Sequence, residues 1–214
     1  MVYRNRLEAG RKLAETLVSQ VARPCVVAAL PRGGIVTANP IARALGAPLT
    51  LLYARKLAPR FAHELAFGAI DEEGEVSVDG AMFVHLRLGP ADLAEAEKRA
   101  RAEMGRQREL YGAPPLASYL PGAGVVLVDD GLATGLTMVA AVRYARRHGA
   151  REITVAVPCA SAEAVERVGR VCDRLVCPTV DEDFAAVGDY YYDFSPVSDE
   201  EVAGILARPV YSGS

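Results

Sequence analysis

The chain has 214 residues, 51% of them hydrophobic and 24% charged, with a formal net charge of −3 at pH 7. This composition excludes a disordered chain and indicates a well-buried α/β protein that forms one large domain or a core with a small appendage. The sequence has no basic surplus to attract nucleic acid, no apolar run near the roughly 18 residues of a membrane span, and no signal-peptide core, so we expect a cytoplasmic protein with neither a nucleic-acid nor a membrane partner.

Predicted strands and helices alternate along most of the chain. Apolar residues at helical spacing predict an amphipathic helix over residues 7–21, and the apolar run at 25–30 predicts a buried strand. The further elements expected, in chain order, are a helix within 34–45, a strand at 49–53, an antiparallel hairpin with arms at 66–70 and 75–86, a charged outer helix at 91–110, a strand at 125–128, a helix at 135–148, a strand at 153–157, a helix at 161–170 and a strand at 174–177. This order predicts a mainly parallel, twisted sheet with helices on both faces.

The most informative stretch runs from Val125 to Met138. Four apolar residues of a predicted strand are followed by the adjacent carboxylates Asp129 and Asp130, a Gly/Thr turn and a predicted helix. Such a turn can direct backbone N–H groups and hydroxyls at a phosphate on the positive end of the helix. Phosphate donors beside carboxylates that suit sugar hydroxyls indicate a ligand that is both sugar and phosphate. The alternative is an ordinary strand–helix turn with a solvated acidic pair.

This stretch resembles the signature of the type I phosphoribosyltransferases, which bind 5-phosphoribosyl-1-diphosphate. The family pattern is a hydrophobic strand, two acidic residues and a Gly/Ala-Thr-Gly-x-Thr loop. The resemblance implies that Asp129 and Asp130 hold the ribose hydroxyls and contribute indirectly to a metal site, and that Asp130 also serves catalysis. The residues implied to bind the ribose and the 5-phosphate, in the loop mostly through backbone N–H groups, are Asp129, Asp130, Gly131, Ala133, Thr134, Gly135, Leu136 and Thr137.

Two cationic segments follow the first two predicted strands. Arg32 offers a planar fork suited to phosphate, and Gly33 and Gly34 permit close approach of the backbone to a ligand. The segment resembles the diphosphate-binding loop of the same family, although Arg-Gly-Gly turns are common on their own. Arg55 and Lys56, which we place at the end of the second strand, resemble pairs that contact the diphosphate in adenine and orotate phosphoribosyltransferases. The alternative is a basic strand end in solvent.

Residues 57–68 show no convincing periodicity and occupy the position of the family's mobile catalytic loop. Such a lid would exclude water from a reaction whose oxocarbenium-like transition state hydrolyses readily. By the resemblance, Arg60 and His63 neutralise the leaving diphosphate, while Glu64 orients a partner or orders the closed loop. The alternative is the edge of a hairpin with solvated charges.

The aromatic-rich stretch 181–194 resembles the base-stacking segment of the 6-oxopurine enzymes, which makes Phe184 and Val187 candidates for contact with a base. Packing or a dimer contact would account for these aromatics nearly as well. The chain departs from the 6-oxopurine pattern at Ala133, where those enzymes have an aspartate, and it lacks their base-selecting lysine within 157–161. The identity of the acceptor base therefore does not follow from the sequence.

As a whole the pattern resembles the predicted phosphoribosyltransferases of bacteria. The resemblance implies a core over 1–177, in which the hairpin and charged helix occupy about 57–120, and a C-terminal hood at 178–214. It also implies an Mg²⁺-dependent enzyme, a homodimer, that transfers 5-phosphoribosyl from 5-phosphoribosyl-1-diphosphate to a nitrogenous base and releases diphosphate. Two alternatives are a non-catalytic regulator that binds the donor as an effector, and hydrolase- or phosphorylase-type chemistry on a phosphorylated sugar.

Overall fold

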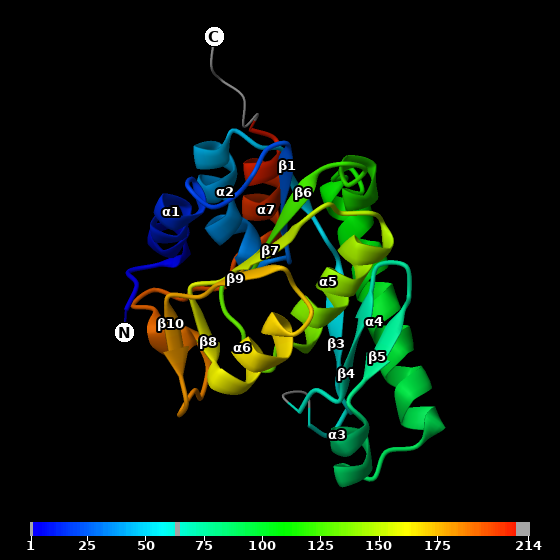
Figure 1. Ribbon diagram of the computed structural model, residues 1–214. Coiled ribbons are helices and arrows are strands. Elements are labelled where there is room, and N and C mark those ends of the chain that lie inside the picture. Colours follow the sequence, from blue (N-terminus) through cyan, green and yellow to red (C-terminus); the bar gives the residue numbers. More distant parts are fainter. Residues whose placement is uncertain (1, 63–64, 209–214) are drawn as a thin grey trace.

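A computed structural model describes residues 2–62 and 65–208 of the chain. Its centre is a parallel five-stranded sheet in the order β2-β1-β6-β7-β9 (Figure 1). The strands are β1 (Cys25–Ala29), β2 (Leu49–Leu51), β6 (Gly124–Val128), β7 (Ile153–Ala156) and β9 (Arg174–Val176). The inner strands β1 and β6 are apolar almost throughout, as expected where helices cover both faces of a parallel sheet.

Two helical layers cover this sheet. Helices α1 (Arg6–Leu17), α2 (Gly33–Leu45) and α7 (Asp199–Leu206) pack on one face, and α5 (Leu136–Arg147) and α6 (Ala162–Gly169) pack on the other. Along β1, Val27 and Ala29 join the first core cluster while Val26 and Ala28 join the second, because successive side chains of a strand point to opposite faces. The predicted fold class is therefore confirmed.

A second sheet of antiparallel strands lies beside α4 and α5 (Figure 1). It contains β3 (Ala54–Leu57), β4 (Gly68–Asp71) and β5 (Val76–Val78), and it is followed by α3 (Gly80–His85) and α4 (Pro90–Tyr111). The prediction of a single strand over 49–53 was wrong, because β2 ends at Leu51 and the chain then enters β3 in this other sheet. Residues 58–67 connect β3 to its partner β4.

The predicted hairpin arm at 75–86 was wrong in its second half. The strand ends at Val78, and the next residue, Asp79, accepts a hydrogen bond at its Oδ1 from the backbone N of Met82 at 3.1 Å. This contact caps the first turn of α3, so residues 80–85 are helical. The apolar alternation in this stretch favoured a strand, but the capping aspartate Asp79 favours a helix, and the helix forms.

The C-terminal segment returns to the start of the chain. Strand β10 (Thr179–Asp181) pairs with β8 (Cys159–Ser161) in a small parallel sheet, and the 3-10 turns η1 (Leu116–Tyr119) and η2 (Val187–Tyr190) complete the elements. Tyr3 forms a bridge with Tyr191, so the first residues lie against the hood segment. Within the described residues, no helix has the length and apolar character to cross a bilayer.

Candidate active site

Asp129 and Asp130 follow the end of β6, at the carboxyl edge of the sheet where open α/β folds bind ligands. The backbone N of Asp130 donates to Asp129 Oδ1 at 2.8 Å. Desolvation raises the pKa of the Asp129 carboxyl well above its usual range, and the neighbouring charge of Asp130 raises it further. The structure thus holds two carboxylates together at an energetic cost that a ligand with hydroxyl donors would offset.

Arg6 compensates part of this negative charge. Its Nε lies 2.6 Å from Asp130 Oδ2, and the side chain is only 10% exposed. Its Nη1 donates to the carbonyl of Ser195 at 2.8 Å, and the guanidinium lies 3.7 Å from the centre of the Phe194 ring. The backbone carbonyl of Asp130 accepts from the hydroxyl of Tyr191 at 2.6 Å. The acidic pair is therefore joined to both the first helix and the hood.

The sequence analysis did not identify Arg6 as a site residue. The signal was present, because Arg6 falls in phase with the buried stripe of α1 that continues through Ala9 and Leu13. A charged residue at a core position of an amphipathic helix indicates a buried partner. The identity of that partner could not be read from the sequence, because Asp130 lies more than a hundred residues further along the chain.

The loop between β1 and α2 packs directly on the acidic pair. A Cβ added at Gly33 would lie 1.9 Å from Asp130 Oδ2, and one at Gly34 would lie 2.8 Å from the carbonyl oxygen of Val128. A side chain at Gly33 would displace the Asp130 carboxylate, and one at Gly34 would press on the backbone of β6, so glycine permits the close approach at both positions. The predicted diphosphate loop and the predicted ribose carboxylates thus adjoin.

The loop of residues 131–137, here called the signature loop, is fixed by hydrogen bonds that its backbone carbonyl groups accept from β8 and α6. The carbonyl of Leu132 accepts from the backbone N of Ser161 at 3.0 Å, and that of Ala133 accepts from the hydroxyl of Ser161 at 2.7 Å. The carbonyl of Thr134 accepts from Nη1 of Arg167 on α6 at 2.6 Å. These bonds turn the carbonyl dipoles toward β8 and α6, and Arg167 and Ser161 are positioning residues that the sequence analysis missed.

Within the described residues, the N–H groups of residues 133–137 in the same loop have no hydrogen-bond acceptor. Among the hydrogen bonds of the described residues, none has its donor in the backbone N of Ala133, Thr134, Gly135, Leu136 or Thr137. Gly135 precedes α5 with a φ of 72°, a conformation in which a side chain is strained. Consecutive free N–H groups at the start of a helix form a binding site for an anion such as phosphate.

Two of the predicted cations for the diphosphate, Arg32 and Arg55, pair with carboxylates of α7 and α4. Arg32 Nη1 lies 3.7 Å from Asp199 Oδ1, and Arg55 Nη2 lies 3.3 Å from Glu103 Oε1. The placement of Arg55 and Lys56 at the end of a core strand was wrong, because both lie within β3 of the second sheet. Burial lowers the pKa of Arg55, although the guanidinium remains charged at neutral pH.

The phosphoribosyl transferase domain model matches residues 2–195 of the chain. The chain belongs to the phosphoribosyltransferase family. In two strains of Mycobacterium tuberculosis, a protein named as a candidate phosphoribosyl transferase is 38% identical over 207 residues, which are 97% of this chain and 47% of that protein. The chain thus spans about half the length of these curated relatives.

Two solved structures share the fold of the chain. The crystal structure of TT1426 from Thermus thermophilus is 40% identical, with a TM-score of 0.75 over 96% of this chain and 98% of that chain. The AQ2163 protein from Aquifex aeolicus is 14% identical, with a TM-score of 0.54 over 89% of this chain and 85% of that chain, and it shares the fold. The domain match and the mycobacterial relatives confirm the resemblance to phosphoribosyltransferases that the signature predicted.

The described part of the loop expected to act as a lid contacts α4. Arg60 is exposed and forms an ion pair with Glu95 on α4. Two of the predicted lid residues, His63 and Glu64, lie outside the described residues. The roles given to Arg60, His63 and Glu64 stay predictions.

The two predicted base contacts differ in their surroundings. Val187 adjoins the signature loop, because a Cβ added at Gly131 would lie 2.5 Å from its Cγ1. The ring of Phe184 is stacked on Tyr190, with ring centres 4.9 Å apart and an interplanar angle of 15°. One face of Phe184 is therefore already covered, whereas Val187 borders the residues implied to hold the ribose.

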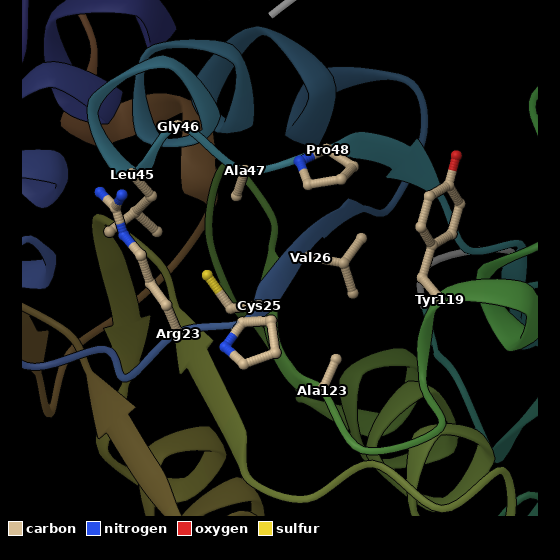
Figure 2. A pocket seen from close by; sticks show the side chains of 10 residues that line it. Arg23, Cys25, Val26, Leu45, Gly46, Ala47, Pro48, Tyr119 and Ala123 are labelled. Atoms are coloured by element: carbon tan, nitrogen blue, oxygen red, sulfur yellow. The ribbon is translucent and has the colours of Figure 1, made fainter. Parts of the chain in front are cut away.

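A cavity of about 560 Å³ lies at the opposite edge of the sheet. It is bordered by Arg23 and Pro24 before β1, by residues 45–48 after α2, and by Tyr119 and Ala123 before β6 (Figure 2). None of the predicted site residues borders it. Parallel strands begin at this edge, so the cavity is separated from the phosphoribosyltransferase signature by the length of the sheet.

Proposed function

We propose that the protein transfers the 5-phosphoribosyl group of 5-phosphoribosyl-1-diphosphate to a nitrogen of a small base and releases diphosphate. The observation that carries this proposal is the contact between Gly33 and Asp130, because it joins a diphosphate loop to ribose-binding carboxylates beside a row of free N–H groups. A donor that presents a 5-phosphate, two hydroxyls and a diphosphate matches these three groups in turn.

Each part of the site has a distinct role in the proposed reaction. The N–H groups of residues 133–137 bind the 5-phosphate, Asp129 and Asp130 accept hydrogen bonds from the ribose hydroxyls, and the 32–34 loop receives the diphosphate. An acceptor nitrogen then forms a bond to C1 of the ribose as the bond from C1 to the diphosphate oxygen breaks, and the diphosphate leaves with the bonding electron pair. Catalysis by these residues consists of orientation and electrostatic stabilisation of the leaving group.

The donor set suits Mg²⁺ bound mainly through the substrate. Within the described part of the chain, no three His, Cys, Asp or Glu side chains gather as a site made by protein alone would require. The adjacent carboxylates of Asp129 and Asp130 supply hard oxygen atoms, and Mg²⁺ keeps several waters and phosphate oxygens when few protein ligands are present. Such an ion would neutralise charge on the departing diphosphate.

Incubation of the protein with donor, Mg²⁺ and a panel of purine and pyrimidine bases tests the proposal, with diphosphate release as the measured quantity. We expect release that depends on one class of base and is lost in the Asp129→Asn, Asp130→Asn double variant. Binding of the donor without release for any base would instead indicate a regulator that uses the donor as an effector. Release without any base would indicate hydrolysis. The acceptor base, the homodimer and the cytoplasmic location stay predictions.

A further inference from the structure

An alternating chain of charges connects the two arginines expected at the diphosphate. Arg32 lies 3.7 Å from Asp199, and Arg55 lies 3.3 Å from Glu103. Between these carboxylates stands Arg106 on α4, whose Nη1 lies 3.2 Å from Asp199 Oδ2 and whose Nε and Nη2 lie 3.1 and 3.0 Å from the two oxygens of Glu103. Five side chains from the β1–α2 loop, β3, α4 and α7 thus form one network.

Arg106 holds the carboxylates of Glu103 and Asp199 in a defined arrangement. Its guanidinium engages Glu103 through two parallel N–H groups and still has a third N–H for Asp199, which uses the planar fork fully. Asp199 also accepts a hydrogen bond from the hydroxyl of Tyr111. Hydrogen bonds from Tyr111 and then Arg106 lower the pKa of the Asp199 carboxyl, so it is charged at neutral pH.

Arg32 lies in the loop after β1, and Arg55 lies on β3 of the second sheet. The backbone links their segments three residues before each arginine, where the N of Leu52 donates to the carbonyl of Ala29 at 3.0 Å, and the guanidinium groups themselves extend well beyond this link. A diphosphate must be met by both cations at a defined distance, and a shift of about 1 Å in such a group can cost on the order of a hundredfold in rate. The network through Arg106 adds a restraint on the two guanidinium groups.

Arg106 also restrains the two carboxylates. Asp199 and Glu103 are close enough for the charge of Asp199 to raise the pKa of Glu103, an effect smaller than the lowering by the hydrogen bond from Arg106. Without Arg106, both carboxylates would turn more fully onto Arg32 and Arg55 and compete with a diphosphate for them. The loss of defined positions for Arg32 and Arg55 and the competition from the two carboxylates would both weaken diphosphate binding.

We propose that Arg106 is a positioning residue that sets Arg32 and Arg55 to receive the diphosphate. This inference rests on the proposed function. It assigns to the charged helix α4 a share in substrate binding, whereas the sequence analysis expected a solvated outer helix.

Calorimetric titration with inorganic diphosphate plus Mg²⁺, and separately with ribose 5-phosphate, tests the inference. The Arg106→Ala variant should bind diphosphate about three- to tenfold more weakly, the range expected for a partly exposed ion-pair network, and bind ribose 5-phosphate as the unaltered protein does. Arg106→Lys should recover part of the loss, because it retains the charge but lacks the fork.

Arg101→Ala is the matched control. Arg101 lies on the same helix, is 49% exposed like Arg106, and pairs with Glu97 at 3.3 Å away from the network. It should bind both ligands normally. Unchanged diphosphate affinity in Arg106→Ala would overturn the inference, and so would an equal loss for both ligands, since that would indicate a general structural role. An unaltered protein that binds neither ligand would overturn the proposed function and this inference with it.

Discussion

Single residues of the acidic pair depend on partners that lie far away in the sequence. Asp130 contacts Arg6 through its carboxylate and Tyr191 through its carbonyl. Burial raises the pKa of the Tyr191 hydroxyl far above its usual range, so it remains protonated and donates to Asp130. The position of Asp130 is therefore set from both ends of the chain, and each contact can be removed separately.

Replacement of Asp129 and Asp130 by asparagine should weaken donor binding by about a hundredfold or more, because two charge-assisted hydrogen bonds to the ribose hydroxyls are lost. The melting temperature should change little, because the loss of repulsion between the carboxylates is offset by the loss of the charge-assisted bond from Arg6 to Asp130. Calorimetry and thermal unfolding measure the two effects. Asp183→Asn, at an exposed position of the hood, is the control, and equal donor affinity in the double variant would place the ligand elsewhere.

Replacement of Arg6 by alanine should reduce donor affinity by about tenfold, because Asp130 loses a charge-assisted bond and its orientation. Arg11→Ala on the exposed side of α1 should have no effect. Titration of each variant with donor in the presence of Mg²⁺ gives the comparison. If the two alanine variants bind alike, Arg6 has only a packing role beside Phe194.

At the scale of elements, the signature loop, β8 and α6 act as one unit. Ser161 caps α6 at the backbone N of Ala164 and also donates to the signature loop, so one side chain serves both elements. Gly135 lies at the contact between them, because a Cβ there would meet Val168 Cγ2 at 3.0 Å and Ala164 Cβ at 3.4 Å. The loop cannot change its shape without moving α6.

Gly135→Val should therefore lower the affinity for ribose 5-phosphate by at least about tenfold, because a β-branched residue is strained at positive φ and presses against α6. Gly149→Val is a close control, since Gly149 has a φ of 76° and no atom within 4 Å of an added Cβ. The control shares the backbone strain but lies after α5, away from the loop. Normal ribose 5-phosphate binding in Gly135→Val would contradict the assignment of the loop as the phosphate cradle.

At the scale of the whole molecule, the parallel core and the signature loop could be predicted from the sequence. Continuous apolar runs fix a buried strand such as β6 locally, and the Asp129–Thr137 motif is contiguous. Strand β8 could not be predicted, because its three residues have no periodicity and pair with β10. The roles of Arg6 and Arg106 could not be predicted for a related reason, because both depend on partners that only the fold brings near.

The first described residues are also joined to the hood, and this contact should be measurable as stability. Tyr3 is 2% exposed, its backbone N donates to the carbonyl of Tyr190 at 2.9 Å, and its hydroxyl donates to the carbonyl of Pro158 at 2.9 Å. Tyr3→Ala should cost about 3 kcal/mol and lower the melting temperature by about 6–12 °C. The control Tyr192→Ala, at a position 73% exposed, should change it by no more than a degree or two. Similar small shifts in both would show that the hood does not depend on the N-terminal residues.

The carbonyl groups of the signature loop point toward β8 and α6, which leaves the N–H groups of residues 133–137 for a phosphate. This arrangement has a consequence for how ionic strength affects anion binding. The 5-phosphate would be bound by backbone dipoles in a fixed frame, whereas the diphosphate would be bound by partly exposed guanidinium charges that dissolved ions screen. Raising sodium chloride from about 50 to about 500 mM, over which the Debye length falls by about threefold, should therefore weaken diphosphate binding several-fold more than ribose 5-phosphate binding. Parallel titrations at both concentrations would reveal the two kinds of anion recognition within one substrate.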